Sequence, residues 1–219
     1  MTKKDENFNK SELFWLDEPD KFSSLYKTKN ILLLPNKIFL NQRIKIIKSF
    51  LKKEINATAL DIGCGSGEFT YILKDYYNKV IGIDISDKMI STAQNNFSTK
   101  NLIFKKSDCE NIDVNDGTAN IIFALGLFDY VYDIQKVINE FKRILKKRGE
   151  MILTIPKNPS IFLPFRWMSG LRYKIFDAPP IVNALSKKEL IQLSEKNNFK
   201  IKKLVSLWAT TWIVHIETL

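Results

Sequence analysis

The sequence predicts an α/β fold in which a doubly wound, mostly parallel sheet carries helices on both faces. Two observations predict it. Short apolar runs alternate with longer stretches of helical periodicity, and a glycine-rich loop joins an early run to the stretch that follows it. The chain has 219 residues, of which 45% are hydrophobic and 26% charged, enough for one domain with a sizeable core.

Five short apolar runs are expected to form parallel strands, at about 58–62, 79–84, 101–105, 119–125 and 150–155. Apolar residues at three- and four-residue steps predict helices at about 37–54, 67–77, 87–97 and 134–147. Parallel strands need right-handed crossovers, which place helices on both faces of the sheet. We therefore expect ligands beyond the carboxyl ends of the strands, where the strand order reverses.

The glycine-rich loop follows the first predicted strand and reads Asp61-Ile62-Gly63-Cys64-Gly65-Ser66-Gly67. Glycines at this spacing allow positive φ and let the backbone approach a ligand closely, and Ser66 is a candidate cap for the next helix. Asp84 ends the next apolar run, about 20 residues on, where a ribose-binding carboxylate is expected. The plain alternatives are a tight turn for the glycines and a turn acid for Asp84, with Asp87 capping the helix.

This pairing resembles the class I S-adenosylmethionine-dependent methyltransferase family, whose loop reads acid-x-Gly-x-Gly-x-Gly and is matched by Asp61, Gly63, Gly65 and Gly67. A nicotinamide or flavin fingerprint would require glycine where Glu68 stands, so that interpretation is disfavoured. The resemblance covers residues 40–155. It implies a Rossmann-like, seven-stranded sheet whose antiparallel sixth and seventh strands, from 199–207 and 210–217, lie at one edge. It also implies S-adenosyl-L-methionine as methyl donor and S-adenosyl-L-homocysteine as product.

The resemblance further implies a role for each residue along the site. Asp61 would reach the methionine ammonium, and Asp84 would accept both ribose hydroxyls. The resemblance also implies backbone contacts from the glycine loop (Gly63, Cys64, Gly65 and Gly67) and from residues that line the methionine part (Leu125 and Gly126). The apolar side chains of Ile85 and Met89 would pack beside the adenine, and the Asp108 acid and the Cys109 amide would bind the adenine edge. A solvated turn is the alternative for Asp108.

The chain departs from the family's usual pattern at two places. Asn120 stands where the fourth strand commonly begins with an acid, and Lys146-Lys147-Arg148-Gly149 replaces a common Lys-Pro-Gly-Gly turn. Neither place is part of the glycine loop or contains the ribose acid. These departures weaken assignment to a close subfamily more than assignment to the class.

The residues that act on the acceptor are less well specified by the sequence. Tyr130, Asp129 and Tyr26 are the candidate catalytic residues, and Arg43 is a candidate partner for the methionine carboxylate or, equally, a surface residue. The single histidine, His215, is expected to be structural. We expect no metal site, because two cysteines are too few for zinc.

A proline-rich segment, 157–185, is expected to form a lid insertion. It separates a cofactor-binding core (37–156), preceded by an N-terminal cap or arm (1–36), from a C-terminal helix and edge strands (186–219). Ser186 to Glu189 form a capping box for that helix, at about 186–197. Aromatic and cationic residues at 161–175 suit an aromatic or anionic acceptor, peripheral contact with a membrane, stacked bases, or simple packing on the domain.

The chain carries a net charge of +10, distributed as +5 over residues 1–58, −4 over 59–130 and +9 over 131–219. This suits an anionic partner or reflects a lysine-rich genome. Only 5 of the 34 basic residues are arginine, which disfavours nucleic acid as the partner.

With no secretory signal and no disulfide framework, a cytoplasmic location is expected. We expect methyl transfer to an oxygen or nitrogen of a small molecule. The alternatives are an RNA methyltransferase and a non-catalytic protein that binds S-adenosylmethionine.

Overall fold

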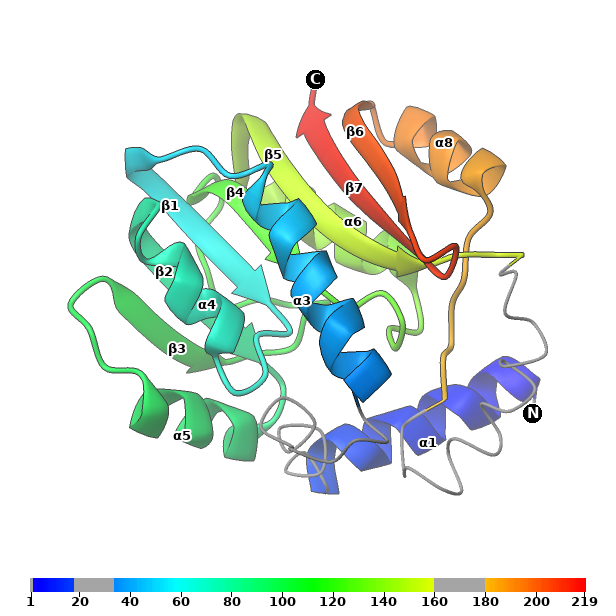
Figure 1. Cartoon of the computed structure of the whole chain (residues 1–219), viewed down its shortest axis with the longest axis horizontal. Coiled ribbons are helices and arrows are strands. Elements are labelled where there is room, and N and C mark those ends of the chain that lie inside the picture. Colours follow the sequence, from blue (N-terminus) through cyan, green and yellow to red (C-terminus); the bar gives the residue numbers. More distant parts are fainter. Residues whose placement is uncertain (1, 18–33, 160–179) are drawn as a thin grey trace.

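The computed structural model describes residues 2–17, 34–159 and 180–219 (Figure 1). Within these ranges lie a seven-stranded sheet and six helices. The strands are β1 (Glu54–Ile62), β2 (Tyr77–Asp84), β3 (Leu102–Lys106), β4 (Ala119–Ala124), β5 (Leu145–Pro156), β6 (Phe199–Leu207) and β7 (Thr211–Thr218). The helices are α1 (Lys3–Asp17), α3 (Leu34–Lys48), α4 (Glu68–Leu73), α5 (Asp87–Asn96), α6 (Ile134–Ile144) and α8 (Lys187–Lys196).

The strands follow the order β3-β2-β1-β4-β5-β7-β6, which confirms the Rossmann-like sheet. The chain first winds outward from β1 to β3 and then resumes on the other side of β1 with β4, so the strand order reverses between β1 and β4. All neighbouring pairs are parallel except those that β7 makes with β5 and β6. The expected antiparallel sixth and seventh strands at one edge of the sheet are confirmed, because β7 pairs antiparallel with both β5 and β6.

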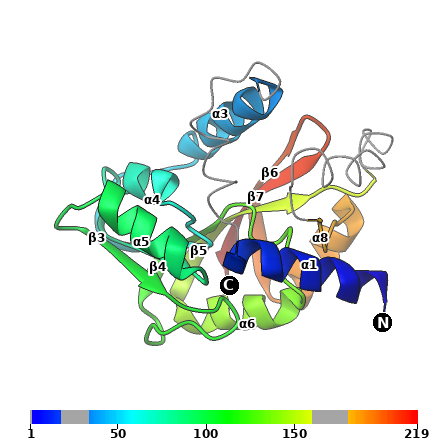
Figure 2. The ribbon, with the colours of Figure 1, turned by 90° about the horizontal axis from the view of Figure 1, so that it is seen from below.

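Both faces of the central strands are buried, which explains their nearly continuous apolar sequences. Along β4, Phe123 packs into a cluster with Ile47 of α3 and Leu73 of α4. The preceding residue, Ile122, whose side chain points to the opposite face of the sheet, packs into a second cluster with Phe141 of α6. Helices α3 and α4 thus cover one face and α6 the opposite face (Figure 2).

Three predicted helices end earlier than their sequence patterns indicate, and the first, α3, stops at Lys48 instead of reaching residue 54, where β1 begins. Helix α4 begins after Gly67, whose φ is 87°, and ends at Leu73, so it has six residues rather than eleven. Ser66 does not cap it, because the Ser66 hydroxyl donates to Glu68 Oε2 instead. Helix α6 ends at Ile144, where Leu145 becomes extended and begins β5.

Helix α1 lies beyond the carboxyl ends of the parallel strands (Figure 1). The Tyr132 hydroxyl, in the loop between β4 and α6, donates to Asp5 Oδ1 at 2.9 Å. The Tyr132 ring packs edge-on against Phe8 at 5.2 Å between centroids. These contacts hold α1 over the edge of the sheet at which ligands are expected. Among the described residues, no helix is long and apolar enough to cross a bilayer.

Candidate functional site

The glycine loop is fixed to the end of β2 by two backbone hydrogen bonds. The amides of Gly63 and Cys64 both donate to Ile83 O, at 2.8 and 3.0 Å. Gly63 and Gly65 adopt φ values of 74° and 54°, in the left-handed region that favours glycine. A Cβ on Gly65 would meet no atom of the described residues within 4 Å, so with respect to them this part of the loop faces open space.

Gly67 has a different role from Gly65, although its φ is also positive. A Cβ on Gly67 would lie 3.0 Å from Ala93 Cβ on α5 and equally close to the Phe104 ring on β3. Its missing side chain therefore lets the start of α4 pack closely on its neighbours. Of these two glycines, Gly65 is the one that borders free space.

Asp84 lies at the carboxyl end of β2, directly beside the loop. Its Oδ2 accepts from the Gly65 amide at 2.9 Å and its Oδ1 from the Ser86 amide at 3.0 Å. Burial raises the pKa of Asp84, and these backbone amides oppose that shift. The Ile85 amide also acts on this carboxylate, whose two oxygens have two lone pairs each and so keep capacity for a donor on a ligand.

Asp61, at the end of β1, is 2% exposed, and its Oδ2 accepts from Thr70 Oγ1 at 2.7 Å. Burial raises the pKa of Asp61 to about 7. Thr70 and Arg43 act against this shift, and the negative charge of Asp84 adds to it. A buried carboxylate of this kind is stabilised in its charged form by a ligand cation.

The loop after β4 forms the opposite side of the site across the point where the strand order reverses. Gly126 has a φ of 89°, and its amide donates to Thr154 Oγ1 at 2.7 Å. A Cβ on Gly126 would lie 3.7 Å from Arg43 Nη1. Arg43 on α3 therefore reaches the carboxyl-end edge of the sheet instead of lying on the surface.

Asp129 follows in the same loop and is half-buried. Burial raises its pKa to about 7, and the positive charge of Arg43 opposes the shift. Arg43 is thus electrostatically linked to both Asp61 and Asp129, on the two sides of the site. Tyr130 is half-buried, and its amide donates to Leu127 O at 3.0 Å.

The residues expected around the adenine lie at the carboxyl ends of β2 and β3. Ile85 is 37% exposed, whereas Met89 on α5 is almost fully buried. The Asp108 carboxylate accepts from the Glu110 amide at 2.8 Å and so closes a local turn. The half-buried Cys109 packs against the core beneath it, and burial raises the pKa of its thiol to about 12.

Some predicted residues lie elsewhere or beyond the described ranges. Tyr26 and most of the expected lid (residues 160–179) lie outside the described residues. His215 is far along the sheet on β7, where its Nε2 and Glu150 Oε2 are 2.7 Å apart, and burial lowers its pKa. Cys64 is buried, with its Sγ near the position of a Cβ on Gly82, so the thiol fills space beside β2.

Three polar residues that orient the site were missed by sequence reasoning. Thr70 binds the Asp61 carboxylate, Thr154 accepts from the Gly126 amide, and Ser86 caps α5 by accepting from the Met89 amide at 3.4 Å. Only Ser86 had a local signal, since serine before an amphipathic helix is a common N-cap. Thr70 and Thr154 are recognisable only once the strands are assembled.

Comparisons with known proteins agree with this geometry. A family model described as "Methyltransferase domain" matches residues 53–214. The chain is 30% identical over 205 residues to the ubiquinone biosynthesis O-methyltransferase of Pelagibacter ubique, covering 91% of this chain and 84% of that protein. It is 31% identical over 135 residues to a Dictyostelium discoideum protein named as a methyltransferase, and spans 48% of that protein's length.

Solved structures show the same fold at lower identity. Magnesium protoporphyrin IX methyltransferase from Synechocystis, with S-adenosylhomocysteine bound, superposes with a TM-score of 0.73 at 15% identity, covering 95% of this chain and 98% of that one. A methyltransferase from Aquifex aeolicus gives a TM-score of 0.67 at 22% identity, covering 92% and 99%. The methyltransferase-domain model matches most of the chain, and the glycine loop and the strand order agree with it. The chain therefore belongs to the class I S-adenosylmethionine-dependent methyltransferases.

Proposed function

We propose that this enzyme methylates an oxygen or nitrogen atom of a small molecule, with Asp129 accepting the proton that the acceptor loses. The observation that carries the proposal is the Asp129 carboxyl, whose pKa is raised to about 7 at the carboxyl end of β4. A carboxylate with a pKa near 7 is a far stronger base than an ordinary aspartate, and about half of it is ionised at neutral pH.

The described residues fit the adenosyl methyl donor. Among the described residues, open space borders Gly65 directly beside Asp84, and each Asp84 oxygen accepts a backbone amide from one side. Two vicinal ribose hydroxyls match those two acceptors. Ile85, at the end of the same strand, offers an exposed apolar side chain for one side of the adenine, with Met89 beneath it.

Charge complementarity supports the orientation of the amino-acid end of the donor. Asp61 offers a buried carboxylate for the ammonium group, and Arg43 offers a guanidinium for the carboxylate. Both lie near the reversal of strand order, between the glycine loop and the loop that begins with Leu125 and Gly126. Asp108 and the Cys109 amide would serve the adenine edge.

The bound donor supplies a sulfonium-activated methyl group for in-line displacement. The residues of this chain therefore need to place the acceptor, exclude water and remove one proton. Asp129 is suited to the proton step, and Tyr130 beside it is suited to orienting the acceptor through its hydroxyl. The basic flanks of the chain and its relation to an O-methyltransferase favour an acceptor with acidic hydroxyl or carboxylate groups.

The test uses isotopically labelled S-adenosylmethionine and cell metabolite extracts, with the wild type and Asp129→Asn compared side by side. We expect label in a small molecule with the wild type, and at least about 100-fold slower labelling with Asp129→Asn. Calorimetry should show cofactor affinity within about threefold of the wild type for this variant.

Three results would overturn parts of the proposal. Label found only in RNA would replace the small-molecule acceptor with a nucleic acid. Tight cofactor binding without label in any fraction would indicate a binding protein. Labelling that Asp129→Asn leaves unchanged would remove Asp129 from the reaction.

A further inference from the structure

A short extended segment, residues 180–185, is the last part of the expected lid before helix α8, and it packs against the loop that carries Asp129. The Val182 amide donates to Asp129 O at 2.7 Å, and the Asn183 amide approaches the same oxygen at 3.4 Å. We call residues 180–185 the strap. The main chain of Asp129 is thus bonded to a segment more than 50 residues away in the sequence.

The Asn183 side chain adds two further bonds to the same loop. Its Nδ2 donates to Phe128 O at 3.2 Å and to Val131 O at 2.5 Å, and the residue is only 9% exposed. These carbonyls lie on the two sides of Asp129 in the sequence. Both amide hydrogens of Asn183 are therefore used to hold the loop that bears the carboxyl, and buried carbonyls of this kind need such partners.

The strap is itself anchored to the sheet at its far end. The Leu185 amide donates to Pro156 O at 2.8 Å, and Leu185 O accepts from the Asn158 amide at 3.0 Å and from Trp212 Nε1 at 2.9 Å. Asn183 therefore holds the Asp129 loop relative to β5 and β7, which form a rigid part of the fold.

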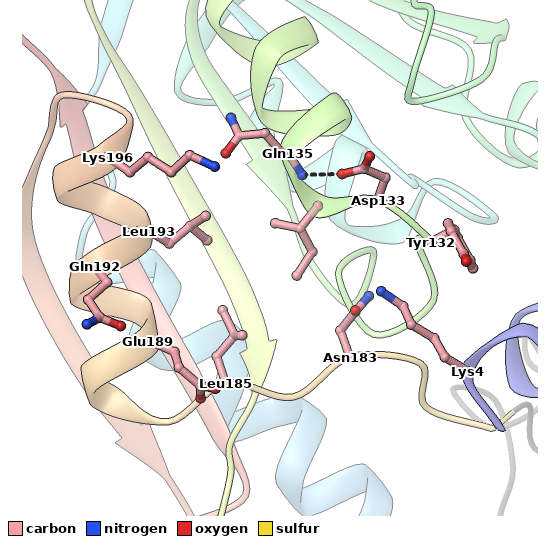
Figure 3. A pocket seen from close by; sticks show the side chains of 11 residues that line it. Lys4, Tyr132, Asp133, Gln135, Asn183, Leu185, Glu189, Gln192, Leu193 and Lys196 are labelled. Atoms are coloured by element: carbon pink, nitrogen blue, oxygen red, sulfur yellow. Dashed lines mark hydrogen bonds between the residues drawn. The ribbon is translucent and has the colours of Figure 1, made fainter. Parts of the chain in front are cut away.

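Helix α1 contacts the strap and the loop from the outer side. Asn7 Nδ2 donates to Ile181 O at 3.4 Å, and Lys4 lies over the Tyr132 ring. Lys4, Tyr132 and Asn183, from three separate segments, line one open pocket of about 510 Å³ (Figure 3). The outer face of Asn183 thus borders a pocket, whereas its amide group is committed to the loop.

We propose that Asn183 is a positioning residue for Asp129: by binding the carbonyls on either side of Asp129, it fixes the carboxylate relative to the sheet. The proposal rests on the role given to Asp129 under the proposed function. It goes further because it links that role to the strap, the last part of the expected lid. Among the described residues, Arg43 of α3 is the charged group that acts on the Asp129 carboxyl.

The consequence of losing Asn183 follows from the burial of Asp129. Without the side-chain amide, two carbonyls lose their donors and the loop relaxes toward water to satisfy them. The Asp129 carboxyl then becomes more solvated, and its pKa falls toward that of an ordinary aspartate. A residue that served only general stability would not change this pKa.

The test is the titration of Asp129 by carbon NMR of protein labelled at the aspartate carboxyl carbon, with the signal assigned by its loss in Asp129→Asn. Asn183→Leu removes both donors at similar size. We expect the wild-type midpoint near 7 and a midpoint lower by at least about one unit in Asn183→Leu. Asn183→Ser, which keeps one donor, should give a smaller shift in the same direction and provides the measurement should the leucine variant fail to fold.

The matched control is Asn197→Leu. Asn197 is also a buried asparagine, 3% exposed, whose side chain donates to Leu193 O at 2.9 Å and pairs with the Gln135 side chain of α6, rather than with the carbonyls on either side of Asp129. We expect it to lower the Tm while leaving the Asp129 midpoint unchanged.

An unchanged midpoint in folded Asn183 variants, or an equal shift in Asn197→Leu, would overturn the proposal. The titration needs no acceptor, so it is independent of the labelling experiment. If the Asn183 variants shift the Asp129 midpoint but Asp129→Asn labels at the wild-type rate, Asn183 still positions Asp129 and Asp129 has no catalytic role.

Discussion

Replacing Asp84 with alanine tests the assignment of the ribose site most sharply. In the structure each carboxylate oxygen accepts one backbone amide, and the proposed site has each also accept one ribose hydroxyl. Hydrogen bonds to a charged group contribute about 1.5–3 kcal/mol each. Two such bonds therefore predict a loss of about 3–6 kcal/mol, which is at least a hundredfold in Kd because each 1.4 kcal/mol is tenfold.

The assay is calorimetric titration of S-adenosylmethionine into the wild type, Asp84→Ala and Asp87→Ala, with Tm as the check on folding. Asp87 is a matched acid three residues on, whose carboxylate pairs with Lys106 at the surface. We expect Asp87→Ala to bind within about twofold of the wild type. The reasoning is refuted if folded Asp84→Ala keeps wild-type affinity, or if both variants lose affinity equally.

Three further predictions concern the loop, the β6–β7 turn and Asp61. Urea unfolding should show that Gly67→Ala lowers the free energy of unfolding by about 1–3 kcal/mol more than Gly65→Ala does, because of the two only Gly67 has atoms 3.0 Å from the position of a Cβ. Equal losses of unfolding free energy would contradict this difference between the two glycines. Ala209→Gly should raise the Tm by about 1–4 °C, because Ala209 has a φ of 53° in the β6–β7 turn, and an unchanged or lower Tm would argue against strain there. For Asp61→Asn without cofactor, the gain in Tm over the wild type should be larger at pH 8 than at pH 5. The native pKa of Asp61, about 7, lies above the ordinary 3.8, so the wild type loses stability as the pH rises from about 4 to 7; a difference independent of pH would contradict the raised pKa.

Much of the fold and part of the site could be predicted because their signals are local. The glycine spacing, the acid ending β2 and the alternation of apolar runs with helical periodicity each occupy a few neighbouring residues. They placed the loop and Asp84 side by side, and the structure joins them through the bond from the Gly65 amide to Asp84 Oδ2.

Other features depend on contacts between distant parts of the chain and have no local signal. Arg43 belongs to a lysine-rich helix, and only the packing of α3 on the sheet brings it to Gly126. Asn183 lies in a proline-bounded segment, and only the folded chain shows its bonds around Asp129.

Asn120 shows how a departure from the family pattern can preserve a structural role. Its Oδ1 accepts from the Thr58 amide and from Lys146 Nζ, both at 3.0 Å. An uncharged acceptor at the start of β4 therefore still ties β1 and β5 to this strand. The sequence marked this position as unusual, but only the assembled sheet shows its partners.

The most direct measurement is a crystal structure of the protein with S-adenosylhomocysteine. We predict the adenosine ribose on Asp84, with each hydroxyl donating to one carboxylate oxygen at about 2.6–3.0 Å, and the ligand passing over Gly65. Density for the nucleoside at any other place, or an Asp84 carboxylate turned away from the sugar, would contradict this description of how the chain holds its methyl donor.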